Sequence, residues 1–152
     1  MRRKEKEIID KKEIEGILRE ANICRVAFCE NNTPYIVPMN FGYKDDCLYF
    51  HCAKTGKKID ILKKNNDVCF EVDIKYDIKN TGVPCNWSTK YTSVIGFGKG
   101  FFIEDLKEKQ EALHIIVNHY APGTFYEFPK KSLRDVGIIL IRITHMTGKR
   151  SA

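Results

Sequence analysis

The chain has 152 residues, of which 43% are hydrophobic and 30% charged, and its formal net charge is +6. These values predict one domain, residues 1–152, with a single hydrophobic core. They exclude a membrane-spanning protein, because no apolar run approaches the roughly 18–20 residues that cross a bilayer. The charged segment Met1–Glu7 lacks the apolar stretch of a secretory signal, so we expect a cytoplasmic protein.

The basic charge and the six cysteines favour neither a nucleic-acid site nor a metal site. Much of the surplus positive charge lies at the two ends of the chain and in Lys54–Lys64, without a recognised nucleic-acid-binding motif. We therefore expect small anionic partners. The cysteines form no C-x-x-C pair, and His114 and His119 lack paired ligand spacing. We expect no metal, and we interpret most cysteines as small buried side chains in a reducing compartment.

The first third of the chain is predicted to hold a helix and three closely spaced strands. Asp10-Lys-Lys-Glu13 has the pattern of a capping box, and apolar residues at helical spacing predict a helix that ends near Asn22. Strands are expected over Cys24–Cys29, Tyr35–Tyr43 and Cys47–His51, with turn-forming residues at Asn31-Asn32 and at Lys44-Asp45-Asp46. Such short connections predict an antiparallel meander.

The remainder of the chain alternates between helices and strands. The predicted elements are a helix over Lys57–Lys64, a strand over Val68–Ile74, a polar connection over Lys75–Lys90, a strand over Tyr91–Ile103, a helix from Asp105 to about His119, an aromatic loop over Tyr120–Pro129 and a strand over Val136–Ile143. Gly96-Phe-Gly98-Lys-Gly100 lies inside a predicted strand. Glycines there permit a bend or a close backbone approach, rather than forming a dinucleotide fingerprint.

Six strands with few intervals long enough for crossover helices predict a mainly β fold, an antiparallel barrel with peripheral helices. Closure of the barrel would remove exposed strand edges. A barrel of six strands is filled by its own side chains. We therefore expect a cofactor to bind outside the barrel, at an interface between subunits.

The segment from Cys47 to Lys63 carries a candidate anion site. It is predicted to form a strand, a glycine-containing turn and a helix whose first turn holds Lys57 and Lys58. A helix N-terminus offers unpaired N–H groups and partial positive charge, so two lysines there are unfavourable unless an anion binds. The alternatives are a bound phosphate and lysines that are simply solvated. The spacing matches neither a P-loop nor a dinucleotide fingerprint.

Four segments resemble a known flavoprotein superfamily. They are Pro34-Tyr-Ile-Val-Pro-Met-Asn-Phe-Gly-Tyr43, Leu48-Tyr-Phe-His51 through Lys58-Ile-Asp, Tyr91-Thr-Ser-Val-Ile-Gly-Phe-Gly98 and Met146-Thr-Gly-Lys-Arg150. The superfamily is that of pyridoxamine 5′-phosphate oxidase-like, FMN-binding split barrels. Within it, the chain most resembles the nitroimidazole-resistance (Nim-type) flavoproteins. The resemblance implies a six-stranded antiparallel split barrel.

The resemblance also implies a homodimer that binds two FMN molecules between its subunits. The residues that it places at the cofactor are Val37, Pro38, Met39, Asn40, His51, Lys54, Thr55, Lys57, Lys58, Trp87, Ser93 and Val94. Lys54, Thr55, Lys57 and Lys58 would hold the phosphate, and Val37–Asn40 would run beside the isoalloxazine ring. Trp87 is interpreted either as a cover over the flavin or as a packed surface residue.

The function that follows is reduction of a small electron-poor compound, such as a nitroimidazole or another nitroaromatic, by FMN. His51 is the candidate catalytic residue, with a purely structural role as the alternative, and NADH or NADPH is a possible electron donor. Non-catalytic flavin binding (storage, transport or sensing) remains the alternative function, and a deazaflavin or haem remains an alternative to FMN. Oxidation of vitamin B6 is disfavoured, because only Lys149 and Arg150 could replace the arginines that grip its phosphate.

Overall fold

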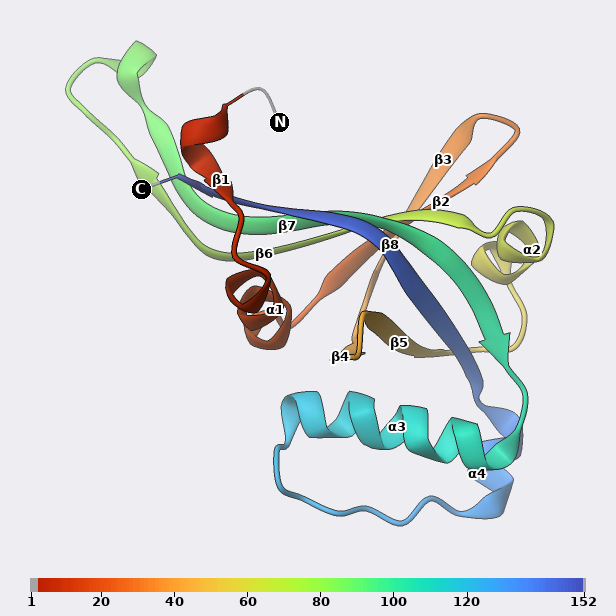
Figure 1. Ribbon diagram of the computed structural model, residues 1–152. Coiled ribbons are helices and arrows are strands. Elements are labelled where there is room, and N and C mark those ends of the chain that lie inside the picture. Colours follow the sequence, from red (N-terminus) through yellow and green to blue (C-terminus); the bar gives the residue numbers. More distant parts are fainter. Residues whose placement is uncertain (1–2, 152) are drawn as a thin grey trace.

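The computed structural model describes residues 3–151 as one long, strongly curved sheet with helices around it (Figure 1). The strands are β1 (Glu7–Ile8), β2 (Cys24–Glu30), β3 (Thr33–Met39), β4 (Gly42–Lys44), β5 (Cys47–Cys52), β6 (Asp67–Lys79), β7 (Ser88–Ile103) and β8 (Gly137–Ser151). The helices are α1 (Lys11–Glu20), α2 (Lys57–Lys64), α3 (Leu106–Tyr120) and α4 (Lys130–Asp135), with 3₁₀ turns η1 (Lys4–Lys6) and η2 (Pro84–Asn86).

The strands pair in the order β3-β2-β6-β7-β8-β5-β4, and β1 pairs with the far end of β8. Every pairing is antiparallel. The predicted mainly β, antiparallel fold with peripheral helices is confirmed. The prediction of six strands in a closed barrel is wrong: the sheet has eight strands, and within residues 3–151 its end strands β3 and β4 do not pair with each other.

The error arises from the predicted strand Tyr35–Tyr43, which is two strands in the structure. β3 pairs with β2, whereas β4 pairs with β5, and only Asn40 and Phe41 separate them. Phe41 is fully buried, and its N–H donates to Tyr120 Oη at 2.9 Å rather than to a neighbouring strand. The two edges of the sheet are thus consecutive segments of one chain, joined at a buried aromatic residue.

The second correction concerns the predicted polar connection Lys75–Lys90, most of which is strand. β6 continues to Lys79 and β7 begins at Ser88, so the two form a hairpin arm with η2 at its tip (Figure 1). Lys75 has φ +54° at a register shift, and residues 75–90 are exposed on both faces. Ile74, Tyr76 and Ile78 do alternate with Lys75, Asp77 and Lys79, so a continuation of the strand was readable from the sequence. The prediction missed it because this short segment was joined with the polar residues that follow, from Asn80, in one connection.

Close backbone approach, predicted for the glycine-rich stretch of β7, is confirmed. A methyl group on Gly98 would lie 2.5 Å from the carbonyl oxygen of Arg142, and one on Gly100 would lie 2.6 Å from Leu62 Cδ1. Gly100 therefore lets α2 pack directly on β7. The core beneath is filled mainly by fully buried side chains that include Phe28, Phe41, Phe50, Phe70, Leu18, Leu48, Ile139 and Ile141.

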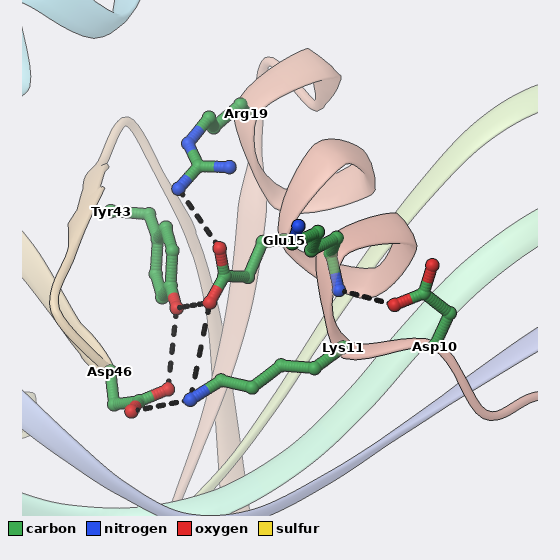
Figure 2. Close-up of polar contacts among 7 residues, drawn as sticks. Asp10, Lys11, Glu15, Arg19, Tyr43 and Asp46 are labelled. Atoms are coloured by element: carbon green, nitrogen blue, oxygen red, sulfur yellow. Dashed lines mark hydrogen bonds and ion pairs between the residues drawn. The ribbon is translucent and has the colours of Figure 1, made fainter.

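A polar cluster fastens α1 to the turn between β4 and β5 (Figure 2). Tyr43 Oη donates to Glu15 Oε1 at 3.1 Å and to Asp46 Oδ1 at 3.3 Å. Lys11 Nζ lies 2.8 Å from Asp46 Oδ2, and Arg19 donates to Glu15 at 3.1 Å. Each charge in the cluster has a partner of opposite sign, as the dashed lines in Figure 2 show.

The six cysteines are free, but the interpretation that most are buried is wrong. Only Cys24 is buried, while Cys85 is exposed and the other four are half-buried at strand surfaces. Within residues 3–151, no helix has the length and apolar character that a bilayer crossing requires.

Candidate functional site

The first turn of α2 differs from those of α1 and α3. Asp10 and Asp105 cap α1 and α3 by accepting hydrogen bonds from backbone N–H groups in the first turn. The N-cap of α2 is Gly56, whose φ of +119° suits glycine and which supplies no side-chain cap. The carbonyl of Gly56 accepts from the N–H groups of Ile59 and Asp60, at 2.9 and 3.1 Å. The earlier N–H groups, those of Lys57 and Lys58, have no intrahelical partner and face an open N-terminus.

The lysines of α2 fall into two groups. Lys57 Nζ lies 4.6 Å from the ring centroid of Tyr35, which places the start of α2 against β3. Lys64, at the other end, donates to Glu30 Oε1 at 2.6 Å, and this bond lowers the pKa of the Glu30 carboxyl. Lys64 is therefore charge-paired. The N-terminal end, where exposed Lys57 and half-buried Lys58 outnumber the one acidic residue, Asp60, carries a surplus of positive charge.

β3 contributes an open backbone edge near this surplus charge. Within residues 3–151, β3 pairs with β2 alone, so the peptide groups on its other side are not used in the sheet. Pro34 and Pro38 suit such an edge, since proline lacks a donor for a second ladder. Val37 and Met39 point toward the core and are half-buried, whereas Pro38 and the following Asn40 are exposed.

His51 lies at the end of β5, with the orientation that the sequence predicts. Leu48 and Phe50 are fully buried, Tyr49 is half-buried and His51 is exposed. His51 pairs in register with Ile138 of β8. Its side chain is therefore accessible two residues before the loop that leads into α2.

The remaining predicted residues are not all brought to α2. Val94 is fully buried in the core, and neighbouring Ser93 is half-buried on the opposite face, in register with Asp73 and Lys149. Trp87 lies on the hairpin arm, where it is 52% exposed and donates from Nε1 to the Thr81 carbonyl at 2.7 Å. Figure 1 shows this arm at the opposite end of the sheet from α2. Within one chain, Trp87 does not meet the lysines.

Sequence reasoning missed a buried lysine near the same helix. Lys109 of α3 is 2% exposed, and its Nζ donates to the Val136 carbonyl at 2.9 Å. Lys109 helps to line a cavity of about 200 Å³ between α2 and the first turn of α3. Lys54, Lys63 and Glu104 also line this cavity. The available signal was its spacing, since Lys109 occupies the same buried stripe as Ala112 and Ile116.

Cys52, the last residue of β5, is close enough to Lys58 of α2 and Lys109 of α3 for their charges to affect its thiol. Burial raises the pKa of the Cys52 thiol, while the positive charges of Lys58 and Lys109 oppose that rise. The positive charges of Lys58 in the first turn of α2 and of buried Lys109 therefore both act on the thiol at the end of β5.

Comparison with known proteins assigns this architecture to a family. A family model described as pyridoxamine 5′-phosphate oxidase matches residues 10–150. The chain belongs to the pyridoxamine 5′-phosphate oxidase family. The resemblance inferred from the four sequence segments is thus confirmed over nearly the whole chain.

Known proteins differ in their similarity to the chain. A candidate 5-nitroimidazole antibiotic resistance protein from Bacteroides thetaiotaomicron is 37% identical, with a TM-score of 0.84 over 94% of this chain and 85% of that one. Flavocytochrome Anf3 from Azotobacter vinelandii is 21% identical, with a TM-score of 0.87 over 100% of this chain and 72% of that one, and shares the fold. An uncharacterized protein of Rhizobium meliloti is 28% identical over 43% of this chain. The matched region covers only 42% of that relative's length.

Two basic residues, Lys149 and Arg150, lie near the C-terminal end of the described chain. Arg150 hydrogen-bonds Glu13, which the sequence predicts as half of the α1 capping box. Lys149 Nζ lies 5.5 Å from the ring centroid of Tyr91. Both side chains are thus in contact with other side chains of the protein itself.

Proposed function

We propose that this member of the pyridoxamine 5′-phosphate oxidase family binds FMN between two copies of the chain and uses it to reduce a small electron-poor compound, such as a nitroaromatic. The observation that carries the proposal is the uncapped, doubly basic start of α2. The 37% identity to a candidate 5-nitroimidazole resistance protein supports the substrate class. NADH or NADPH would supply the electrons.

The residues at the start of α2 fit a flavin phosphate. A phosphate dianion would accept hydrogen bonds from the free N–H groups of Lys57 and Lys58, at the positive end of the helix dipole. The side chains of Lys54, Thr55 and Lys57 are exposed around that turn, and Lys58 is half-buried beside it. The lack of a side-chain cap leaves this position open to an external anion.

The edge of β3 fits the flavin ring. The backbone N–H and C=O groups over Val37–Asn40 that are not used in the sheet would hydrogen-bond to the polar edge of the flavin ring and orient it. Pro38 has no N–H group, so one donor fewer needs a partner. Bound FMN supplies the electron-transfer chemistry, and the protein supplies binding, orientation and electrostatics. Ser93 and Val94 point to opposite faces of β7, so we expect only one of the two side chains to contact the cofactor.

An exposed apolar area on the outer face of the sheet supports a homodimer. Ile36, Ile95, Phe97 and Phe101 are 62%, 46%, 53% and 39% exposed. A second copy would cover these side chains, because monomers rarely leave such contiguous apolar surface in water. It could also bring the partner's hairpin arm toward the α2 end of the sheet.

Sedimentation velocity with and without FMN tests the dimer. We expect FMN to favour the dimer, because a ligand stabilises the state that binds it. Phe97→Glu should give monomers that release the flavin. Monomers that retain stoichiometric FMN would contradict an interfacial site.

His51 is the proposed proton-transfer residue of the reductase. An exposed imidazole near the flavin can donate a proton to a substrate as electrons arrive. We predict that His51→Ala retains FMN and the dimer but loses most of the acceptor-dependent oxidation of reduced flavin. His51→Gln, which keeps hydrogen bonding without a transferable proton, should behave like His51→Ala. Turnover at the wild-type rate in both variants would make His51 structural.

The visible spectrum of the purified protein tests the function as a whole. We expect a flavin spectrum that bleaches on addition of NADH or NADPH and recovers when a nitroaromatic is added. A flavin that stays oxidised with either donor would instead favour a non-catalytic flavin-binding protein. The spectrum of a deazaflavin or of haem would show that the protein binds that cofactor instead of FMN.

A further inference from the structure

We propose that the cavity lined by Lys54, Lys63 and Lys109 binds a compact oxyanion, either a phosphate or a carboxylate, and that this site is separate from the start of α2. Its volume is about 200 Å³. Ligand pockets for drug-sized molecules measure about 300–1,000 Å³, so a flavin ring is too large for this cavity, whereas a small ion is not.

Lys109 is the main reason to expect an anion. An ammonium group has three N–H donors, and Lys109, 2% exposed, makes one hydrogen bond within residues 3–151, to the neutral carbonyl of Val136. The nearest carboxylate oxygen, Glu104 Oε2, is 4.0 Å away on a side chain that is 83% exposed. A buried charge with so little compensation is costly unless a counter-ion accompanies it.

The walls of the cavity place further positive charge around Lys109. Lys63 and Ile59 reach it from α2, and Lys54 reaches it from the loop before that helix. Three lysines and one glutamate leave a surplus of two positive charges on the lining. The apolar part of the wall is formed by Phe102 and Ile138. Lys54 and Lys63 are exposed, so water screens their charges, whereas the charge of buried Lys109 is screened little and attracts an anion most strongly.

The location of the cavity separates it from the proposed flavin site. It opens between α2 and the first turn of α3, whereas the free N–H groups lie at the tip of α2 beside Tyr35. Lys54 is the one residue that both sites could use. The ion could be free phosphate, a free carboxylate or the anionic end of a larger ligand, and these sources share one recognition chemistry.

Thermal unfolding of the FMN-loaded protein, in which the flavin phosphate occupies the start of α2, tests the site in sodium phosphate, sodium acetate and sodium chloride at equal ionic strength. Phosphate or acetate at about 100 times its Kd should raise Tm by roughly 5–10 °C relative to chloride. Lys109→Met, which keeps the side-chain volume without the charge, should abolish this response. If Lys109 only holds the Val136 carbonyl, Lys109→Met will lower Tm and leave the anion response intact, which overturns the proposal.

Two rim variants keep the test informative should Lys109→Met fail to fold. Lys63→Glu should weaken anion binding by roughly tenfold or more, since a hydrogen bond to a charged group is lost and repulsion is gained. Glu104→Gln should strengthen it, because the only carboxylate on the lining is neutralised. Lys131→Met, on exposed α4, is the control and should match wild type. Equal responses in all of these variants would overturn the site.

FMN titration distinguishes this proposal from the flavin site. Lys109→Met should bind FMN and riboflavin with wild-type affinity. If it weakens FMN but not riboflavin, which lacks the phosphate, the cavity holds the flavin phosphate and the separate site is refuted. A wild-type protein that responds to neither phosphate nor acetate refutes it as well, whatever its flavin content.

Discussion

The first turns of α1 and α2 carry the same pair of lysines but differ in their caps. α1 begins at Asp10, whose carboxylate accepts from the backbone N–H of Lys12 at 2.9 Å. Its next charged residue, Lys11, pairs with Asp46 (Figure 2). α2 begins at Gly56, which provides no side-chain cap, and within residues 3–151 neither Lys57 nor Lys58 forms an ion pair, although acidic residues are preferred at both positions.

The difference separates structural charge from charge available to a ligand. Around α1, each charge of the cluster is satisfied by another side chain, so the cluster stabilises the fold. Around the start of α2, the positive charge is in excess, and the local rules for helix stability are broken. Such a departure from local consistency is expected at functional sites, where a ligand supplies the missing partner.

The largest expected effect lies at α2. Lys57→Ala and Lys58→Ala should each weaken FMN binding by roughly 10- to 100-fold, since a hydrogen bond to a charged group contributes about 1.5–3 kcal/mol. Titration of the apoprotein with FMN, followed by flavin fluorescence, measures the change. Lys12→Ala, the same helix position in α1, and Lys64→Ala, which is paired with Glu30, are the matched controls. If all four variants lose affinity equally and slightly, the lysines of α2 are merely solvated.

The reverse outcome is expected at the start of α1. Asp10→Ala should lower the free energy of unfolding by about 1 kcal/mol, because the capped N–H group loses its acceptor. Urea unfolding measures this loss. FMN affinity should not change, so a variant that binds FMN more weakly would show that the two helix starts are not independent.

The smallest expected effect depends on pH and on the cluster in Figure 2. Burial, together with the negative charges of Glu15 and Asp46, raises the pKa of Tyr43. A raised pKa in the folded state means that this contribution to stability is complete below the unfolded value, about 10, and is lost as pH rises above it. Tyr43→Phe should cost about 0.5–1.5 kcal/mol at neutral pH.

The variant and the wild type should therefore converge in alkaline solution. Unfolding measured at neutral pH and again above about pH 10 gives the comparison. Parallel stability profiles for Tyr43→Phe and wild type would show that Tyr43 ionises equally well in the folded and unfolded chains.

Much of the fold could be predicted because its signals are local. The caps Asp10 and Asp105 are recognised from the residues that follow them, and they cap α1 and α3 in the structure. The alternation from Leu48 to His51 follows from the two faces of a single strand. The Lys57–Lys58 turn was also identified locally, as a helix start with unfavourable charge.

The remaining features depend on partners far away in the sequence. The break at Asn40–Phe41 is set by the pairing of β3 and β4 with different strands, and by the contact of Phe41 with Tyr120. The hairpin arm is stabilised by the β6–β7 ladder rather than by a buried face. Lys109 was missed because a lysine is ordinarily assigned to the surface, and its burial follows from packing between α3 and residues near Val136.

The position of β8 has a consequence for the order in which the protein can fold. β8 is the last strand in the chain, yet it lies inside the sheet, where it pairs with β7, β5 and β1. Glu7, for example, finds its partner only at Lys149. During synthesis, β5 and β7 therefore remain with open apolar edges until β8 has left the ribosome. Such late, long-range pairing slows folding, and the unpaired apolar edges favour aggregation during this interval.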